Sequence, residues 1–273
     1  MPELPEVEIT KQGLLPLINQ TVKAVAIRNA AMRWPIPTHL PETLAEQKLL
    51  TLSRRAKYIQ LGFDNGTLLV HLGMSGKISL LDRNYPSEKH DHFDILFQNG
   101  KVLRLNDPRR FGAVLWAGQN PASHPLLSNL GPEPLEESFD GPYLHNQLKS
   151  RKAAIKTTIM DAHIVVGVGN IYANEALFRA GIHPQSIANR LSLTTCKRLV
   201  AKIKATLADA LEAGGSSLRD FAAVNGNSGY FQQSYYVYAR TNQACKKCKT
   251  LIKCIRLGQR STFYCEKCQK YIQ

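Results

Sequence analysis

Four cysteines near the C-terminal end restrict the folding of this chain more than any other feature. Cys245 and Cys248 are separated by two residues, sixteen residues follow, and Cys265 and Cys268 repeat the same spacing. Two such pairs can place four thiolates at the corners of a tetrahedron, which predicts one structural Zn²⁺ ion. Disulfide bonds are the competing explanation, and a cytosolic setting disfavours them.

The segment between the two cysteine pairs predicts a β-hairpin. Gly258-Gln259 lies between apolar residues of the range 251–264, so Arg260 is expected at the hairpin tip. A guanidinium there is well placed to bind a backbone phosphate, and a finger that only caps the fold is the alternative. Cys196 and Cys254 lie outside the pattern and are expected to be buried or half-buried thiols.

Net charge indicates the class of partner. The 273 residues include 35 Lys and Arg against 21 Asp and Glu, a formal charge of +14. Such an excess concentrates polyanions and suggests nucleic acid, and a solvated basic surface is the alternative. No apolar run approaches the roughly 18 residues of a membrane helix, and the N-terminus lacks a secretory signal. We therefore expect a cytosolic protein with no membrane partner.

The first 120 or so residues have the pattern of β-structure. Asn65-Gly66 and Asn99-Gly100 each lie between apolar runs, the strongest short-range signal for a hairpin. Before the second turn, Phe93, Ile95 and Phe97 alternate with polar residues, which predicts a strand with one mostly buried face. An N-terminal antiparallel β-sandwich or barrel follows, with flanking helices.

The rest of the chain has a different pattern. Five prolines between residues 117 and 143 predict an interdomain linker. Beyond it, apolar residues recur at helical spacing between Ser192, a good N-cap, and Gly214-Gly215, a good stop. Strands followed by helices indicate an α+β multi-domain chain. Its expected parts are a β-sandwich domain (2–120), a linker (121–143), a helical domain (144–236) and a zinc finger (237–273).

The chain begins MPELPEVE, and this peptide has two explanations. Pro5 fits the first position of a helix, with Glu6 and Glu8 complementing the helix dipole. Pro2 and Glu3 are not explained in this way. Loss of the initiator methionine leaves Pro2 with a free secondary amine of pKa about 8. Such an amine can attack a sugar C1′, and the Glu3 carboxylate can move protons beside it.

Two loops contain residues that could insert between the bases of a DNA duplex as a wedge. Met74 lies between glycines in the segment 73–76, and Arg109 and Phe111 follow Asp107-Pro108. Singly, these side chains are explained by packing or a surface ion pair. Together, in a basic protein, they could fill the gap that a base leaves when it is removed from the stack of a duplex.

A second phosphate-type signal is the segment 165–171. Gly167 and Gly169 precede a helix-compatible run, so Asn170 and backbone N–H groups lie at a helix N-terminus that favours anions. The third glycine of a dinucleotide-binding motif is missing, which argues against that function.

These signals together resemble the formamidopyrimidine-DNA glycosylase family, bacterial base-excision repair enzymes that act on oxidised purines. The resemblance runs from end to end of the chain. Its segments are 1–8, Arg54-Arg55-Ala56-Lys57-Tyr58, His71-Leu72-Gly73-Met74-Ser75-Gly76, Lys89-His90-Asp91-His92, Asp107-Pro108-Arg109-Arg110-Phe111-Gly112, Gly131-Pro132-Glu133-Pro134-Leu135, 167–172 and the four cysteines.

The resemblance implies a β-sandwich, a helical domain with a helix-two-turns-helix motif, and a zinc finger, with duplex DNA in a basic cleft between the domains. The motif would run from a helix at 148–160 into the helix after Asn170. A loop around 217–231 would close on the flipped base. A monomer is expected.

The family roles transfer to matching positions of this sequence. Pro2 resembles the nucleophile, Glu3 the proton donor and acceptor, and Glu6 a support of the same catalytic site. Phosphates around the lesion would be held by Lys57, His71, Asn170 and Arg260, of which Lys57 and Arg260 also serve catalysis. The gap would be filled by Met74, Arg109 and Phe111, with Arg109 facing cytosine.

Two stretches depart from the common family pattern. Asn225-Gly226-Asn227-Ser228-Gly229 replaces a usual Asp-Gly-Lys-Pro-Gly, and Ala239 replaces a frequent glycine. These changes leave the preference among lesions open.

The expected function is a bifunctional DNA glycosylase and AP lyase for 8-oxoguanine and formamidopyrimidines. An endonuclease VIII-type enzyme for oxidised pyrimidines is the closest alternative, although that branch usually has glycine where this chain has Leu4. Two other classes are a catalytically silent binder of damaged DNA and a zinc-ribbon RNA-binding protein.

Overall fold

The computed structural model describes residues 1–216 and 230–273. The chain divides into two compact units. The first unit comprises Met1–Ser128 and Ala213–Gln232, and the second comprises Asn129–Glu212 and Gln233–Gln273. Each unit is described by itself below.

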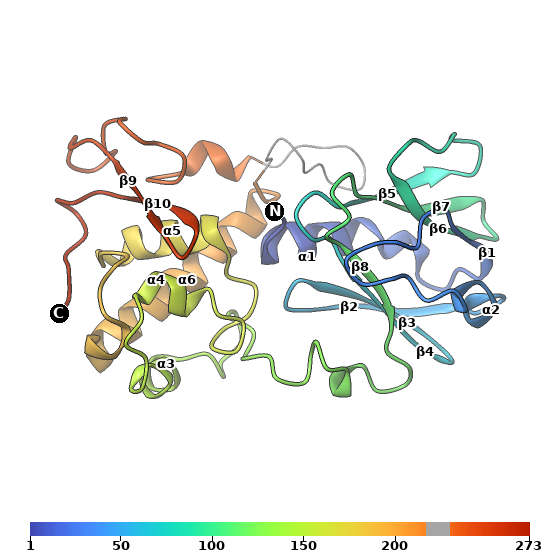
Figure 1. Cartoon of the computed structure of the whole chain (residues 1–273), viewed down its shortest axis with the longest axis horizontal. Helices are drawn as coiled ribbons and strands as arrows, with labels where there is room; N and C mark the ends of the chain where they lie inside the picture. The colour runs from blue at the N-terminus through green and yellow to red at the C-terminus, as the bar shows by residue number, and fades with distance from the viewer. Residues whose placement is uncertain (217–229) are drawn as a thin grey trace. The chain divides into compact units, whose positions relative to one another are not determined.

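Two four-stranded antiparallel sheets form the first unit (Figure 1). One sheet has the order β1 (Val22–Ile27), β6 (Asp91–Phe97), β7 (Lys101–Asn106) and β5 (Lys77–Asp82). The other has the order β2 (Leu49–Arg55), β3 (Tyr58–Phe63), β4 (Gly66–His71) and β8 (Ala113–Trp116). Apolar side chains from both sheets meet in one core, which confirms the predicted β-sandwich.

Both predicted Asn-Gly hairpins are confirmed. Phe63 pairs with Gly66 across the β3–β4 turn, and β6 pairs with β7 across the turn that contains Gly100. Gly100 has φ +81°, a left-handed conformation in which glycine has no steric penalty.

Strand β6 differs from its prediction, because its polar face is buried as well. His92 and Asp94 are only 4% and 5% exposed. His92 Nε2 lies 2.9 Å from the carbonyl oxygen of Asp107, and Arg104 Nε donates to Asp94 at 3.0 Å. The alternating pattern therefore predicted the strand correctly, but its expectation of an exposed polar face was wrong. Polar groups on neighbouring segments form the hydrogen bonds that these buried side chains need.

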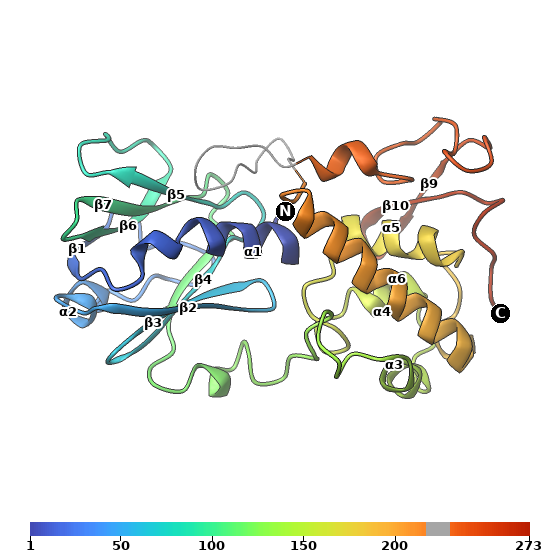
Figure 2. The ribbon, with the colours of Figure 1, turned by 180° about the vertical axis from the view of Figure 1, so that it is seen from behind.

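The N-terminal helix α1 (Leu4–Gly13) begins as the sequence predicts, with Pro5 in its first turn. It packs on β2 and β3 (Figure 2). A shorter helix, α2 (Leu40–Leu44), lies against β1, and the 3-10 segments η1 (Leu15–Leu17) and η2 (Pro121–Ser123) complete the connections of the first unit.

Four helices and one hairpin form the second unit. These are α3 (Gly141–Leu148), α4 (Ile155–Ile159), α5 (Asn170–Ala180), α6 (Leu193–Glu212), β9 (Lys253–Leu257) and β10 (Arg260–Tyr264), with the 3-10 segments η3 (Ala188–Arg190) and, at the border of the units, η4 (Phe231–Ser234). Helix α6 confirms its prediction: the Ser192 hydroxyl accepts the Thr195 N–H at 3.2 Å, and Gly214 and Gly215 have φ +74° and +78°. It packs against α3 and α5 (Figure 2).

The helix expected at 148–160 is shorter than predicted. Helix α3 ends at Leu148 and α4 spans only Ile155–Ile159. Between them the backbone pairs with residues 186–189 instead of with itself: Ala188 N–H donates to the Ala153 carbonyl at 3.0 Å, and Ile155 N–H to the Ser186 carbonyl at 2.8 Å. Helix α3 also begins at Gly141, so the last three residues of the stretch expected as linker are helical.

Among residues 1–216 and 230–273, no helix has the length and apolar character that crossing a membrane requires.

Candidate functional site

The N-terminal residues are buried and held by hydrogen bonds. Glu3 is 2% exposed and Glu6 is fully buried. Glu6 Oε2 accepts the backbone N–H of Glu3 at 2.9 Å, and the Glu3 side chain accepts a backbone N–H of Glu6, so the pair forms a capping box. The second carboxylate oxygen of Glu6 accepts the N–H of Ser216 at 2.9 Å. Glu6 therefore fixes the backbone of Glu3, and with it the position of the adjacent Pro2.

Lys57 lies in the tight turn between β2 and β3, where Ala56 has φ +55°. Arg54 supports this turn by donating to the Ala56 carbonyl at 2.8 Å, and it also binds the Glu8 carboxylate of α1 at 3.0 Å. Burial acts to raise the pKa of Glu8, but hydrogen bonds from Lys11 and Arg54 outweigh it and hold the pKa below its ordinary value. The turn of Lys57 is thus attached to the helix that positions Pro2 and Glu3.

His71 ends strand β4 as a neutral hydrogen-bond donor. Its Nδ1 accepts the backbone N–H of Gly73 at 3.0 Å, which leaves the proton on Nε2. Burial lowers the pKa of His71 to about 4, with further lowering by the positive charges of Lys57 and Arg33. A neutral imidazole with a fixed tautomer can donate to a phosphate over a wide pH range.

Because the folded pKa lies below the ordinary 6.5, stability is lost as pH falls from 6.5 towards 4. The unfolded chain takes up the proton first in that interval. The original chain should lose free energy of unfolding between pH 7 and pH 5 through this group, and His71→Asn should not. We expect the loss in His71→Asn to be smaller by about 1–2 kcal/mol. Urea unfolding at both pH values measures this difference. The exposed His39→Asn is the control, and an equal effect there contradicts the assignment.

Two loops carry the predicted wedge residues, and Asp107 clamps them together. The fully buried Asp107 accepts the Ser75 hydroxyl at 2.6 Å through one oxygen and the Gly112 N–H at 2.8 Å through the other. Gly73 lies so close to the second loop that a Cβ there would fall 2.4 Å from the carbonyl carbon of Phe111. The segments of Met74 and Phe111 are therefore adjacent and rigidly held.

The aromatic and cationic wedge residues also contact each other. The Arg109 guanidinium lies 4.9 Å from the centre of the Phe111 ring, a cation–π contact, and Phe111 is 41% exposed. Arg109 itself is exposed, while its backbone N–H donates to the Ser75 hydroxyl at 3.2 Å. Met74 is half-buried in the neighbouring loop. An exposed apolar ring beside a guanidinium is suited to enter a base stack.

In the second unit, a buried lysine orients Asn170 at the N-terminus of α5. Lys156 is fully buried and donates to Asn170 Oδ1 at 2.6 Å and to the Thr262 hydroxyl at 2.7 Å. The Asn170 amide nitrogen in turn donates to the Ser261 carbonyl at 3.1 Å. This network joins α4, α5 and β10, so Asn170 lies beside the strand β10, whose first residue is the exposed Arg260.

Glu175 attaches the finger to the same helix. Its carboxylate accepts the consecutive backbone N–H groups of Tyr236, Val237 and Tyr238 at 2.8–2.9 Å. Burial raises the pKa of Glu175, and the three N–H groups oppose that rise without cancelling it. The chain entering the finger is thereby fixed to α5, one and a half turns from Asn170.

Ala239, one of the departures from the family pattern, has φ +57°. This left-handed conformation is strained for a residue with a Cβ, so Ala239→Gly is expected to stabilise the folded chain by about 0.5–1 kcal/mol. Denaturant unfolding of the zinc-loaded protein measures the gain. Ala244→Gly, at a position without positive φ, should destabilise it, and a loss in both variants contradicts the strain argument.

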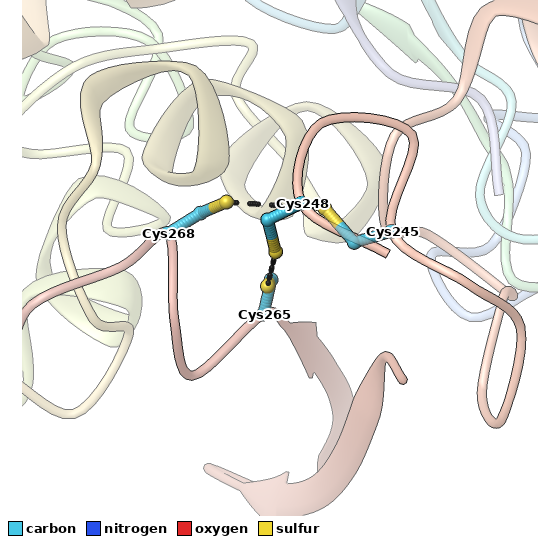
Figure 3. A group of neighbouring side chains, drawn as sticks. All are labelled: Cys245, Cys248, Cys265 and Cys268. Carbon is cyan, nitrogen blue, oxygen red and sulfur yellow. Dashed lines mark hydrogen bonds between the residues drawn. The ribbon is translucent and has the colours of Figure 1, made fainter. Parts of the chain in front are cut away.

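The four predicted ligand cysteines come together (Figure 3). Their sulfur atoms all lie within 4.8 Å of one another, with 3.9 Å between Cys245 and Cys268 and 3.4 Å between Cys248 and Cys265. A tetrahedral zinc ion with Zn–S bonds of about 2.3 Å separates its sulfurs by about 3.8 Å, so the cluster fits one structural Zn²⁺. The predicted hairpin is also confirmed, with Gly258-Gln259 at its turn.

The two cysteines outside the cluster differ. Cys196 is fully buried as expected, and burial raises its pKa to about 11. Cys254 is exposed, so its prediction as a buried or half-buried thiol was wrong. It lies on a two-stranded sheet whose β9 has only β10 as its strand partner, and one face of such a ribbon meets solvent.

Sequence reasoning missed four residues that position the candidate site: Ser75, Asp107, Lys156 and Glu175. Ser75 and Asp107 were seen only as members of motifs. Lys156 and Glu175 had a usable signal, since a lysine or glutamate among apolar helical residues is buried only with partners.

A two-sheet sandwich, a unit of four helices and a four-cysteine finger define a zinc-finger protein with the parts that the sequence predicted for a DNA-repair glycosylase. Family models match in three places: the formamidopyrimidine-DNA glycosylase N-terminal domain at residues 1–114, its H2TH domain at 130–222, and the zinc finger found in FPG and IleRS at 242–270. The chain belongs to the formamidopyrimidine-DNA glycosylase family.

Individual relatives agree with this assignment. The formamidopyrimidine-DNA glycosylase of Methylobacillus flagellatus is 60% identical over 99% of this chain and 97% of its own. That of Shewanella denitrificans is 52% identical over 98% of this chain and 99% of its own. The MutM (FPG) protein of Thermus thermophilus has a TM-score of 0.89 at 33% identity, covering 99% of both chains. A Lactococcus lactis FPG variant in complex with Fapy-dG containing DNA has a TM-score of 0.91 at 32% identity, covering 98% of this chain and 100% of its own.

Proposed function

We propose that this chain excises oxidised purines, 8-oxoguanine and formamidopyrimidines, from duplex DNA and then cleaves the strand at the abasic site. The observation that carries this proposal is the buried Pro2-Glu3 pair, fixed by the Glu6 carboxylate at the start of α1. One solved relative is bound to Fapy-dG containing DNA and another to carbocyclic 8-oxo-G containing DNA. Their lesions are the substrates expected here.

The chemistry follows from the first two residues of the mature chain. The unprotonated Pro2 nitrogen attacks C1′ of the flipped nucleotide, the bond from C1′ to the base breaks, and the base leaves with the proton that the Pro2 nitrogen gives up. Glu3 then protonates the sugar ring oxygen, the bond from C1′ to that oxygen breaks, and the ring-opened product is an iminium ion between Pro2 and C1′. The iminium acidifies the C2′ hydrogens, so loss of a proton there expels the 3′ phosphate, and a second elimination expels the 5′ phosphate. Glu3 moves these protons.

The DNA contacts are divided between the units. Lys57 and His71 on the first unit, and Asn170 and Arg260 on the second, would hold phosphates around the lesion. The exposed Phe111 ring and Met74 would fill the space that the flipped base leaves, and Arg109 would face cytosine. The lesion loop expected at 217–231 lies almost wholly outside the described residues.

The remaining assignments follow from this activity. The functional boundaries we propose are 2–120, 121–143, 144–236 and 237–273, with the zinc ion held by the last part. The partner is damaged double-stranded DNA and the enzyme acts as a monomer. Its location would be the bacterial cytosol, where the chromosome lies.

The decisive experiment is cleavage of a duplex with one 8-oxoguanine opposite cytosine, with borohydride trapping in parallel. We expect nicking and a covalent adduct on the chain, and little cleavage of a thymine glycol duplex. Faster cleavage of thymine glycol would instead favour an endonuclease VIII-type enzyme. Binding without nicking or adduct would indicate a silent binder.

Pro2 is tested in the same assay. Pro2→Gly keeps a primary α-amine, so the expected adduct is reduced rather than absent. Protein that retains Met1, identified by intact mass, should give none, because its Pro2 nitrogen is acylated. An adduct of unchanged amount and rate in both samples contradicts the assignment of the nucleophile.

A further inference from the structure

A hollow of about 290 Å³ lies on the sheet formed by β1, β6, β7 and β5. Its floor consists of two cross-strand rows, Ala24–Leu96–Val102 and Ala26–Asp94–Arg104. The alternate residues of the same strands point into the core of the sandwich, so the hollow is on the outer face. The two alanines have short side chains and leave the space open.

The second row of the floor belongs to a closed ion network. Arg104 donates to Asp94 at 2.9 Å and to the Pro86 carbonyl at 2.8 Å, which fastens the connection between β5 and β6 to the sheet. Arg28 donates to the same Asp94 carboxylate at 2.6 Å. Arg104 also pairs with the buried Asp91, outside the lining, at 3.4 Å. Two arginines therefore balance two carboxylates, and neither Asp94 nor Asp91 is left without a cationic partner.

The rim of the hollow has hydrogen-bonding capacity that the protein does not use. Within the part of the chain that the structure describes, the Arg83 guanidinium has neither a hydrogen bond nor an ion pair, and Arg28 uses only one of its amino groups. Three arginines against Asp94 and Asp91 leave an excess of one positive charge, that of Arg83. Tyr85, at 54% exposure, adds an aromatic side chain to the lining.

This site is separate from the residues proposed to act on DNA. Strand β5 runs from the loop of Met74 to the residue before Arg83, and its six residues span about 20 Å. The hollow also lies on the outer face of the sheet, and none of its lining residues is among those assigned a role in catalysis or DNA contact.

We propose that this hollow binds a nucleoside monophosphate, with the phosphate between Arg28 and Arg83 and the base on the apolar row Ala24–Leu96–Val102 and against Tyr85. A phosphate monoester carries a charge of about −1.5 to −2 at pH 7, and the Arg83 guanidinium and the remaining donors of Arg28 can bind it, arginine in bidentate geometry. An aromatic ring stacks on a base. The volume lies just below the usual range of ligand pockets, about 300–1,000 Å³, so the hollow has room for one nucleotide at most.

The test is calorimetric titration of the full-length, zinc-loaded protein with adenosine 5′-monophosphate, adenosine and inorganic phosphate. We expect one saturable site for the monophosphate and binding at least about tenfold weaker for each fragment alone. Arg83→Glu reverses a charge at the rim, and Ala26→Leu fills part of the floor. Each variant should lower the affinity for adenosine 5′-monophosphate by about tenfold or more.

The matched control is Lys48→Glu, which makes the same change of net charge at an exposed position outside the lining. It should leave the affinity within about twofold, since screening weakens distant surface charges. Equal losses in Lys48→Glu and Arg83→Glu, or no saturable site, overturn the proposal. Nicking of the 8-oxoguanine duplex by Arg83→Glu is expected to be unchanged. The nucleotide site and the repair activity are therefore tested by separate measurements, and either hypothesis can be rejected without the other.

Discussion

Glu3→Gln is expected to slow base excision by about two to four orders of magnitude while duplex binding persists. The change removes the only proton that residue 3 can donate to the sugar ring oxygen, and it removes the base needed for the eliminations. Positioned acid–base groups contribute about 10²–10⁴-fold, so the single-turnover excision rate should fall by that factor. The measurement is quenched-flow excision of 8-oxoguanine at saturating enzyme.

The structure separates this chemical effect from a folding effect. The Glu3 side chain accepts a backbone N–H of Glu6, and a glutamine oxygen at the same position can accept it too. The start of α1 should therefore persist, and affinity for an uncleavable abasic-site duplex should change by less than about threefold. An excision rate within tenfold of the original would count against Glu3 as the proton donor. Glu42→Gln, on the distant helix α2, is the control and should have no effect.

The sequence predicted the local elements well because their signals are local. The Asn-Gly turns, the proline start of α1 and the cysteine spacing each depend on a few neighbouring residues. The candidate site residues Pro2, Arg109 and Arg260 were selected from motifs that resemble those of the family, and their roles stay predictions.

What the sequence could not predict depends on distant partners. The polar face of β6 is buried because Arg104 and Asp107, on other segments, satisfy it. The helix expected at 148–160 shortens because residues 186–189 take its backbone hydrogen bonds. Lys156 is buried because the hydroxyl of Thr262, more than a hundred residues further along, accepts a hydrogen bond from its ammonium group. In these three places tertiary pairing outweighed local propensity.

Loss of the zinc ion is the second large effect expected. The finger has a small core, in which Cys245 and Cys265 pack against Phe178, Val237 and Ile252. A domain of this size depends on its metal, because structural zinc supplies about 10–16 kcal/mol of folding free energy. Cys248→Ser should reduce zinc to well below one ion per chain and unfold the β9–β10 hairpin.

The consequence for DNA follows from the network around Arg260. Without the hairpin, Arg260 has no fixed position, and the hydrogen bonds from Lys156 and Asn170 to Thr262 and Ser261 are lost. We expect the affinity for the lesion duplex to fall by at least about tenfold, the value of one charge-assisted phosphate contact.

A matched variant in the same hairpin distinguishes metal loss from general damage to the finger. Cys254→Ser alters an exposed thiol that is not a member of the four-sulfur cluster, so zinc content and affinity should both stay within about twofold of the original. Fluorescence anisotropy with the abasic-site duplex, together with zinc determination on the same samples, measures both quantities. If Cys248→Ser lost its zinc and still bound DNA like Cys254→Ser, the finger would not hold Arg260 for a phosphate. Its role would then be to stabilise the helical unit through Glu175 and the chain at 236–238.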